Sequence, residues 1–597
     1  MNPSTFYKNH LEKQTLLRAN LSAKSKLFST VRFFFFLTFL IAIVYQLNER
    51  ALQSAIMLTV FLVILMALLI KFHNKVKAQL MMASSLVNLS NLELGKLEGN
   101  YEKLDGGEEF KNDDHAYSAD LDLFGHKSIF QLINQTTSLF GKQKLASWLL
   151  HKTKGNLDEI VNRQTAAKEL SDNQEWCLNY RATGLSKQID QSQVETFNSW
   201  LHQEPILLSS RLIKLATIIL PSIVLILGIG AFLFGFTYSF TIPFLIIAMV
   251  LLGKQHKYAS KTVNDTFRAL GTLRVLAKQL ALLERSSFNS EYLKSIKKSI
   301  DATKNAGKEI NRLHHLLDNL ESRNGMMHPF INIPFMLDIR WLIKLEQWRK
   351  ENEEHVENWF ESLATAESLI SLSGLYFNYP KWVTPTFSNE PYYFEAKNLT
   401  HPMLGKEGVS NNFSISGTGI TNLITGPNMA GKSTFLRTVA TSWVFAQIGA
   451  PVRAENIAIN PEAQVFTAMR VKDNLSESIS SFYAELDRIK QLINRIKSGE
   501  QCLYFLDEIL KGTNSADRHK GAEALIRQLN RLEVTGFVST HDLELGELAA
   551  KEKFVKNFSF ESDIINGKIT FDYTIKEGIC SSFNACELMR QMGIEVD

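Results

Sequence analysis

Cysteine is scarce in this sequence, and its few cysteines are not arranged in pairs. The 597 residues include four, at positions 177, 502, 580 and 586, with no CxxC pair and no metal-ligand spacing to a histidine. A disulfide framework and a cysteine–histidine metal site are therefore not indicated. We interpret the four side chains as reduced thiols in a cytosolic environment.

A large excess of charge of one sign is also missing. The chain has 65 Lys and Arg against 61 Asp and Glu, which gives a formal net charge of only +4. A strong nucleic-acid footprint would be more basic, or basic in a concentrated patch, so the net charge does not argue for DNA. The chain is too long for one hydrophobic core, and we expect several domains.

Charged residues are almost absent from two successive runs near the N-terminus. From Phe33 the chain reads FFFFLTFLIAIVYQL, and after a short polar turn ALQSAIMLTVFLVILMALLI leads to Lys71. Each run is roughly long enough for a bilayer crossing, which needs about 17–25 residues, and the short turn predicts a hairpin. A signal peptide is the alternative, but the basic leader is long, no A-x-A site follows, and a second apolar run comes at once.

A second uncharged region runs from Leu215 to Gly253. It holds 39 residues between Lys214 and Lys254. A helix of this length would extend nearly 60 Å at about 1.5 Å per residue, or about two hydrocarbon thicknesses. A turn at Gly235–Ser239 predicts a second hairpin, whose last crossing, Tyr238–Gly253, is short. The alternative is a buried core hairpin, although helices at the surface of a soluble core show polar faces.

Basic residues flank both predicted hairpins on one side. They stand at positions 8, 13, 18, 24, 26, 32, 71, 75, 77, 211, 214, 254, 257 and 261. An excess of Lys and Arg marks the cytoplasmic side of membrane segments. We therefore expect a multi-pass protein of the cytoplasmic (inner) membrane, with the rest of the chain in the cytoplasm.

A phosphate-binding pattern follows the predicted strand Ile420–Thr425. The next residues fit G-x-x-x-x-G-K-[ST], and a helix-like stretch comes after them. In this order, backbone N–H groups and the helix N-terminus converge on phosphate oxygens. Lys432 is predicted to reach the β- and γ-phosphates, and Ser433 to hold Mg²⁺. The predicted ATP-binding residues are Gly426, Pro427, Asn428, Met429, Ala430, Gly431, Lys432, Ser433 and Thr434.

Three further polar residues stand at the ends of later predicted strands. Asp507 and Glu508 end the apolar run that begins at Cys502, and His541 follows the predicted strand Thr535–Thr540. Asp507 suits Mg²⁺ binding, and Glu508 suits polarising the attacking water as a general base. An imidazole at His541 is predicted to sense or orient the γ-phosphate.

A serine-rich segment, DNLSESISSFYAEL, lies between these two groups of residues and precedes an amphipathic helix predicted to reach Ile496. In ATPases of the ABC type a serine-bearing loop at this place contacts the nucleotide of the other subunit, which makes Ser480 and Ser481 candidates. A plain N-capped helix is an equally good interpretation of the local sequence.

Several of these motifs together resemble the ATPase domain of the MutS mismatch-repair family. They are TGPNMAGKSTFLRT, DNLSESISSFYAEL, FLDEILKGTNSADR and STHDLELGEL. Asn398–Leu404 (NLTHPML) resembles the family's His-Pro motif, and Tyr573–Ile594 its closing segment. Upstream, the segments similar to the family's helical core and lever are Leu121–Leu149, Ile160–Leu170, Phe267–Leu283 and Ile331–Ala364.

The resemblance implies a fold and a mode of action. The expected fold is a C-terminal α/β P-loop NTPase (ABC-type ATPase) domain, preceded by an all-α helical core or lever and two transmembrane helical hairpins. It implies a homodimer formed through the ATPase domains, in which Ser480 or Ser481 faces the partner's nucleotide. ATP binding would close the dimer and move the helical core, which in relatives clamps DNA.

The chain departs from the family's pattern at several points. It contains no Phe-x-Glu, the element with which mismatch-recognising members read the mispaired base, and it begins with a membrane hairpin. Recognition of mismatches is therefore not expected. Ala430 replaces a common glycine with another small residue. The chain ends soon after the ATPase motifs, which leaves little room for the family's C-terminal helix-turn-helix extension.

The predicted organisation has six segments. They are a cytoplasmic N-terminal segment (1–30), a first transmembrane hairpin (31–71), a first part of the helical core (72–211), a second hairpin (212–254), a second part of the core or lever (255–390) and the ATPase domain (391–597).

Three functions are compatible with this organisation. The first is a membrane-anchored MutS-like ATPase that acts on nucleic acid, with mismatched or branched DNA as the partner implied by the resemblance. The second is a membrane-tethered mechanical ATPase with a protein or lipid partner. The third, an ABC-type half-transporter, predicts six long helices and an LSGGQ-like signature, whereas this chain offers four segments and LSESISS.

Overall fold

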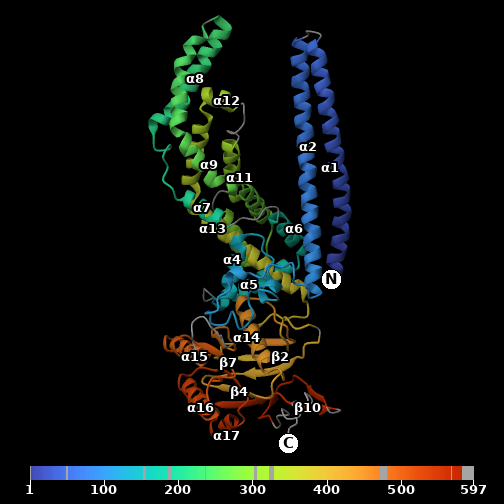
Figure 1. Ribbon diagram of the computed structural model, residues 1–597, viewed down its shortest axis with the longest axis vertical. Helices are drawn as coiled ribbons and strands as arrows, with labels where there is room; N and C mark the ends of the chain where they lie inside the picture. The colour runs from blue at the N-terminus through green and yellow to red at the C-terminus, as the bar shows by residue number, and fades with distance from the viewer. Residues whose placement is uncertain are drawn as a thin grey trace. The chain divides into compact units, whose positions relative to one another are not determined.

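The chain folds into two compact units (Figure 1). The computed structural model describes residues 2–48, 52–151, 156–185, 191–235, 237–301, 305–321, 328–405, 407–470, 481–565 and 568–580. Unit 1 comprises Met1–Leu94, Gln135–Gln143 and Asn173–Ser368, and unit 2 comprises Gly95–Asn134, Lys144–Asp172 and Leu369–Asp597. The expected order, a helical region followed by a C-terminal α/β domain, is confirmed.

Unit 1 is built from helices in its described residues. They are α1 (Pro3–Asn48), α2 (Leu52–Leu97), α4 (Leu139–Leu149), α6 (Gln174–Gly184), α7 (Gln191–Leu201), α8 (Arg211–Phe234), η2 (Tyr238–Thr241), α9 (Ile242–Arg285), α10 (Glu291–Asp301), α11 (Ala306–Glu321), α12 (His328–Phe335) and α13 (Leu337–Asn378). Of these, α2, α4 and α13 contribute residues to both units.

In the part of the chain that the structure describes, four helices of unit 1 are long and apolar enough to cross a membrane. The candidate spans are Pro3–Tyr45, Met57–Leu97, Arg211–Phe234 and Tyr238–Thr262. Many of their large apolar side chains are exposed, which is unusual for an ordinary soluble surface. The spans themselves are assigned by their length and composition.

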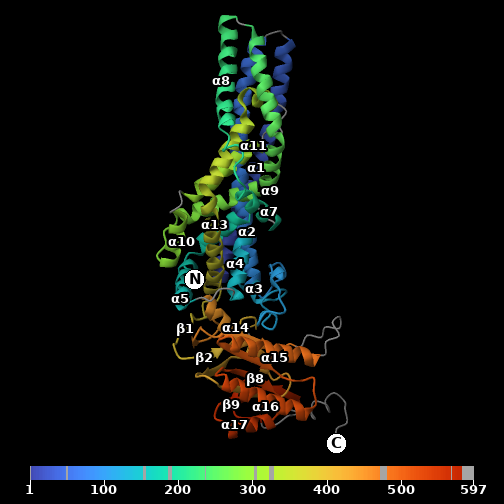
Figure 2. The same cartoon turned by 90° about the vertical axis from the view of Figure 1, so that its left-hand side faces the viewer.

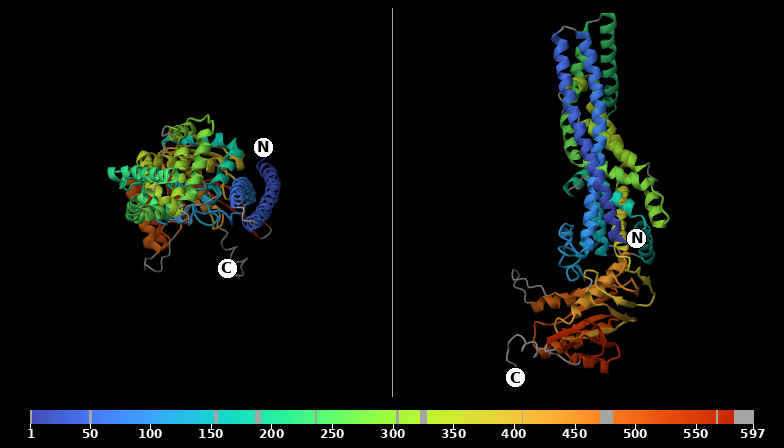
Figure 3. Two further views of the ribbon diagram at one scale, coloured as in Figure 1. Left: turned by 90° about the horizontal axis from the view of Figure 1, so that it is seen from above. Right: turned by 90° about the vertical axis from the view of Figure 1, so that its right-hand side faces the viewer.

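The helices α1 and α2 lie side by side (Figures 1 and 3). Polar side chains connect them outside the most apolar stretch. The Nδ1 atom of His10 lies 2.9 Å from Ser90 Oγ, and His73 contacts both Ser25 and Arg32. The two helices of the predicted first hairpin therefore stay paired beyond their apolar part, where contacts between polar side chains connect them.

The fourth apolar segment of the chain is the beginning of a longer helix. The predicted crossing Tyr238–Gly253 overlaps the start of α9, which continues through Gly253 as far as Arg285 (Figure 2). A glycine inside a helix costs only about 1 kcal/mol relative to alanine, which a long helix with many packing contacts absorbs. Its apolar segment and its packed segment are thus one uninterrupted helix.

A buried carboxylate on α13 fixes the start of this hairpin. Glu346, which is 2% exposed, accepts hydrogen bonds from the backbone N–H groups of Leu207 and Leu208, just before α8. It also accepts one from the hydroxyl of Tyr258 on α9, at 2.7 Å. One side chain of α13 therefore holds the entry to α8 and the middle of α9.

Unit 2 contains an α/β domain with two main sheets. The six-stranded sheet has the order β12-β9-β4-β8-β7-β6, and the four-stranded sheet has the order β1-β5-β2-β3. In the first sheet the pairs among β9, β4, β8, β7 and β6 are parallel, and β12 is antiparallel to β9. The strands are β1 (Thr386–Phe387), β2 (Phe394–Leu399), β3 (Asn411–Ile415), β4 (Thr421–Thr425), β5 (Asn456–Ile459), β6 (Gln464–Ala468), β7 (Cys502–Asp507), β8 (Gly536–Thr540), β9 (Val555–Ser559), β10 (Ser562–Ile565), β11 (Lys568–Phe571) and β12 (Lys576–Glu577).

Helices surround the six-stranded sheet. They are α14 (Lys432–Ile448), α15 (Ser481–Lys497), α16 (Ser515–Arg531), η4 (Glu544–Glu547) and α17 (Leu548–Lys551). Figure 2 shows α14 and α16 on opposite sides of β8. The upstream part of unit 2 adds η1 (Glu108–Phe110), α3 (Ile129–Ile133) and α5 (Leu157–Ser171).

The helix α14 is buried on nearly all sides because it lies between the two sheets. Trp443 stacks on Phe394 of β2, and Phe435 packs edge-on against Phe413 of β3. The same helix contacts β6, β7 and β8 of the larger sheet. The contacts with both sheets explain why most residues of α14 are buried.

An upstream segment of unit 2 covers the edge strand β6. The N–H of Thr467 donates to the carbonyl of Ala116 at 2.9 Å. Asp120 accepts hydrogen bonds from the hydroxyl of Thr467 and from the N–H groups of Met469 and Arg470. The edge of the sheet is thereby paired instead of exposed.

Candidate functional site

Three strands of the large sheet end at the same edge. In the parallel register Thr425 of β4 pairs with Thr540 of β8, and Asp507 of β7 pairs with Ser539. The residues that follow these strands must therefore lie close together at the carboxyl edge. Open α/β sheets bind ligands at this edge.

The loop after β4 depends on two glycines. Gly426 has φ 144° and Gly431 has φ 106°, values that favour glycine. A Cβ atom at Gly426 would lie 2.5 Å from the carbonyl oxygen of Phe560. The helix α14 starts directly after Gly431, so its N-terminal amides face the space inside the loop.

Lys432 is buried and lies against its own loop. Its Nζ atom donates to the carbonyl oxygens of Gly426 and Pro427, at 2.9 and 3.0 Å. Burial lowers the pKa of Lys432, while the nearby carboxylates of Glu508 and Asp507 act in the opposite direction. The ammonium group is therefore held at the mouth of the loop.

Glu508 sits between two cationic or polarisable partners. Its Oε1 atom lies 2.8 Å from His541 Nε2, and its Oε2 atom lies 2.8 Å from Lys511 Nζ. The hydrogen bond with His541 is the main cause that lowers the pKa of Glu508 to about 2. Its backbone has φ 51°, in the left-handed region, so the structure holds this carboxylate in a strained position.

Asp507 and Ser433 offer oxygen ligands near this carboxylate. Asp507 Oδ1 accepts a hydrogen bond from Ser539 Oγ, which fixes one oxygen and leaves the other for a ligand. Ser433 is partly exposed in the first turn of α14. Hydroxyl and carboxylate oxygens are the donors that Mg²⁺ prefers.

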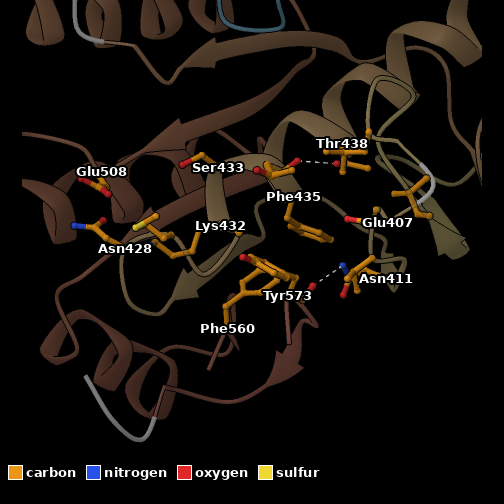
Figure 4. A pocket seen from close by; sticks show the side chains of 17 residues that line it. Glu407, Asn411, Asn428, Lys432, Ser433, Phe435, Thr438, Glu508, Phe560 and Tyr573 are labelled. Atoms are coloured by element: carbon orange, nitrogen blue, oxygen red, sulfur yellow. Dashed lines mark hydrogen bonds between the residues drawn. The ribbon is translucent and has the colours of Figure 1, made fainter. Parts of the chain in front are cut away.

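A pocket of about 320 Å³ adjoins the loop (Figure 4). Among the predicted residues, its lining contains Asn428, Met429, Gly431, Lys432, Ser433, Thr434 and Glu508. His541 contacts Glu508 from outside the lining, and Asp507 lies beside Glu508 at the end of β7. Gly426, Pro427 and Ala430 form the remainder of the loop, where Ala430 is buried.

Two aromatic residues and an asparagine of this pocket were not predicted from the sequence. They are Asn411 and, about 150 residues further along the chain, Phe560 and Tyr573. Asn411 donates to the carbonyl of Tyr573 at 3.1 Å and accepts from the N–H of Ile575 at 2.7 Å. Their only sequence signal was the position of Tyr573 at the start of the family's closing segment.

The loop that carries Leu404 and Glu407 closes another side of the pocket. Arg453 holds it by donating to the carbonyl oxygens of His401, Leu404 and Gly405. His401, in the predicted His-Pro motif, is partly buried, and the loss of water around its ring lowers its pKa to about 4. A neutral imidazole therefore supports the base of this loop at pH 7.

Two predicted residues are not placed at this site. Ser480 lies outside the described residues, and Ser481 is the first residue of α15, where its side chain is not described. Their predicted contact with a second subunit stays a prediction.

Comparison with known proteins assigns a family to this part of the chain. Residues 422–594 match the family described as MutS domain V. This segment is similar to MutS domain V. MutS domain V is an ABC-like ATPase domain, as the motifs predicted.

Curated relatives extend the match slightly upstream. The chain is 31% identical over 220 residues to the DNA mismatch repair protein MutS of Ehrlichia chaffeensis, which is 36% of this chain and 27% of that protein. It is 28% identical over 257 residues to the DNA mismatch repair protein MutS of Thermosipho melanesiensis, which is 42% of this chain and 30% of that protein. The chain thus spans less than a third of the length of the relatives it matches.

The residues present fit ATP with Mg²⁺. The glycine loop and the N-terminus of α14 offer amides for phosphate oxygens, and the loop's conformation requires glycine at position 426, where a Cβ atom would collide with the carbonyl oxygen of Phe560. Ser433 and Asp507 supply hard oxygen donors for the metal. The pocket's volume lies at the lower end of the range usual for small-molecule sites.

Proposed function

We propose that this protein binds ATP with Mg²⁺ and hydrolyses it at the loop Gly426–Thr434. The observation that carries the proposal is the convergence of Lys432, Asp507, Glu508 and His541 at the carboxyl edge of one sheet. When bound, the metal ion supplies charge stabilisation for the phosphates, and Ser433 and Asp507 would hold it.

The protein's own groups have separate roles in this proposal. Lys432 exchanges the carbonyls of Gly426 and Pro427 for the phosphates. Glu508, ionised because of its low pKa, accepts a hydrogen bond from the attacking water and orients it. His541 lies 2.8 Å from the Glu508 carboxylate, and in this proposal it also senses the γ-phosphate. The pocket beyond the loop, with Phe560 and Tyr573, receives the base.

We also propose that four helices anchor the protein in the cytoplasmic (inner) membrane, with unit 2 in the cytoplasm. Support comes from the length and apolarity of the four spans, their exposed apolar side chains and their basic flanks. The six segments predicted from the sequence remain our proposal for the organisation of the chain. Among the described residues, four apolar spans argue against a half-transporter with six.

Hydrolysis would act mechanically on the helical region. By family analogy the protein works as a dimer of ATPase domains, with Ser480 or Ser481 facing the partner's nucleotide. Glu346 of α13 makes hydrogen bonds at both helices of the second hairpin. In this proposal a movement of α13 would therefore be transmitted to these two membrane segments. A protein or lipid partner at the membrane follows naturally from this arrangement.

DNA is a second candidate partner, and one observation favours it. The relatives' names include DNA mismatch repair. Binding to duplex or branched DNA that weakens steeply with salt would support this candidate, because phosphate contacts release counterions. DNA binding that is absent or does not depend on salt would favour the protein or lipid partner at the membrane.

The test of the proposed ATPase is a pair of glutamine variants in the detergent-solubilised full chain. Glu508→Gln should lower kcat by about 100-fold or more, because a positioned general base contributes roughly 10²–10⁴-fold, and should retain bound ATP. Glu533→Gln, an exposed position in the same unit, is the matched control and should hydrolyse normally. Normal turnover in Glu508→Gln would remove this residue from its assigned role.

A further inference from the structure

The short helix α12 has an inverted distribution of polar and apolar residues. Its sequence is HPFINIPF, and its outward side chains Phe330, Ile331 and Phe335 are 72%, 49% and 40% exposed. A surface helix of a soluble protein shows its polar face to water and buries its apolar face. In α12 the exposed face is the apolar one.

The polar residues of α12 point toward the protein. His328 Nε2 lies 2.9 Å from Asp338 Oδ1, and the Nδ2 group of Asn332 donates to Asp338 Oδ2 at 3.0 Å. The N–H of Asp338 in turn donates to Asn332 Oδ1 at 2.9 Å. Both Asn332 and Asp338 are 8% exposed. Polar groups that satisfy one another inside the protein are what an apolar medium requires of a helix.

The position of α12 along the second hairpin gives its depth. It contacts α8 and α9 (Figure 1). A groove of about 280 Å³ lies between α8 and α12, and its lining is apolar, from Pro221, Gly228 and Phe232 on one side to Pro334 and Phe335 on the other. Pro221 and Phe232 lie about 10 and 27 Å along the helix from Lys214, the last charged residue of α8, at about 1.5 Å per residue.

These distances match the interior of a bilayer. A hydrocarbon core is about 30 Å thick, so a helix packed against this part of α8 would lie inside it. With eight residues, α12 is too short to span the core. The chain would have to enter and leave on the same side.

We propose that α12 is a re-entrant membrane element, with phospholipid acyl chains against its outer face and in the groove between α8 and α12. This inference rests on the proposed membrane location of α8 and α9. Acyl chains fit because the groove wall on α8 continues into the exposed apolar surface of the same helix, where Ile226 is 67% exposed. A Cβ atom at Gly228 would meet nothing within 4 Å, so the floor of the groove is open to such a chain.

The inference is tested with nitroxide labels on the full chain in phosphatidylglycerol–phosphatidylethanolamine vesicles. Cys586 is replaced by serine, and the other native cysteines, Cys177, Cys502 and Cys580, are buried. Labels are placed by Phe330→Cys and by Ile331→Cys as a second variant of the same face. Ile226→Cys reports α8, and Ser295→Cys, exposed on α10, reports a position in water. Collision rates with oxygen and with a water-soluble nickel complex are measured at each site, and ATPase rates check that each variant folds.

The inference predicts a severalfold higher oxygen-to-nickel collision ratio at Phe330 and Ile331 than at Ser295, and a similar ratio at Ile226. A low ratio at Phe330 and Ile331 with a high ratio at Ile226 would overturn the inference and leave the membrane anchor intact. Poor access of both reagents to Phe330 and Ile331 would mean that a protein surface, such as a second copy of this chain, covers α12. A low ratio at Ile226 would defeat the membrane anchor itself, and the inference with it.

Discussion

At the scale of single residues, the Glu508 side chain is oriented by its strained backbone, and its two partners set the charge of its carboxyl group. Its φ of 51°, its contact with His541 and its ion pair with Lys511 all act on the same side chain. Because these partners favour the charged form, Glu508 stays ionised well below its ordinary pKa of 4.5. A general base that is always ionised at neutral pH can orient water without waiting for deprotonation.

The low pKa of Glu508 predicts a pH dependence of stability. A carboxylate with a lowered pKa in the folded state stabilises that state above about pH 4.5, and this contribution is lost as the pH falls toward 2. The stability of the wild type relative to Glu508→Gln should therefore be constant from pH 8 to 5 and fall below pH 4.5. Thermal unfolding in detergent, followed by circular dichroism, measures this difference.

The control for this titration is Glu533→Gln. Its difference in stability from the wild type should not change between pH 5 and pH 3 in the way expected for Glu508→Gln. A difference between wild type and Glu508→Gln that stays constant down to pH 3 would contradict the assigned ionisation.

At the scale of elements, the loop that closes the pocket depends on Arg453. Its guanidinium group bonds three carbonyl oxygens of the segment from His401 to Gly405. Lysine presents a point charge and cannot reproduce this fork of donors. Arg453→Lys should raise the KM for ATP several-fold and change kcat little, since the loop lies away from Glu508.

Steady-state kinetics of Arg453→Lys beside Arg531→Lys, an exposed position in the last turn of α16, measures this effect. A fall in kcat at unchanged KM would show that the loop acts on the chemical step instead of on binding.

The hold of α13 on the second hairpin depends on Glu346. The Glu346 carboxylate accepts hydrogen bonds from backbone N–H groups. In Glu346→Gln the side-chain NH₂ group would face one of these donors and could not accept its hydrogen bond. Loss of hydrogen bonds to a buried charged group should cost about 3 kcal/mol. The expected result is a lower melting temperature of the helical region, measured in detergent by circular dichroism at 222 nm.

Glu354→Gln, at an exposed position of the same helix, is the control and should melt like the wild type. Equal melting temperatures for the two variants would show that the Glu346 contacts add nothing to the stability of the second hairpin.

The elements of the site differ in how far the sequence predicts them. Part of the site could be predicted from the order of residues along the chain. Parallel pairing brings the carboxyl ends of strands together, and these ends are followed by the glycine loop, by Glu508 after Asp507, and by His541. Phe560, Tyr573 and Asn411 reach the pocket through long-range packing, which no local pattern encodes.

Two further features also lie beyond local pattern. The segment Ile331–Ala364 was predicted as one helical stretch, but it divides at Met336, which has φ 51°, into α12 and α13. Residues 95–134 group with the ATPase domain because Asp120 binds the edge strand β6. Both outcomes depend on contacts between residues distant in sequence.

At the scale of the whole molecule, the account joins an ATPase domain to apolar helices. Among the described residues, four apolar spans carry exposed side chains such as Phe232, which is 81% exposed, and the proposed membrane anchor would give these surfaces an apolar medium. The protein should therefore stay in the membrane pellet when membranes are washed with alkaline carbonate. Its release into the supernatant, beside a known peripheral protein as control, would contradict the anchor.

The most direct test of the central claim is a structure of the detergent-solubilised protein with Mg²⁺ and a non-hydrolysable ATP analogue. The account predicts phosphates at the N-terminus of α14, with Lys432 Nζ moved from the carbonyls of Gly426 and Pro427 onto them and the metal held by Ser433 and Asp507. A nucleotide bound elsewhere, with Lys432 still on those carbonyls, would contradict it.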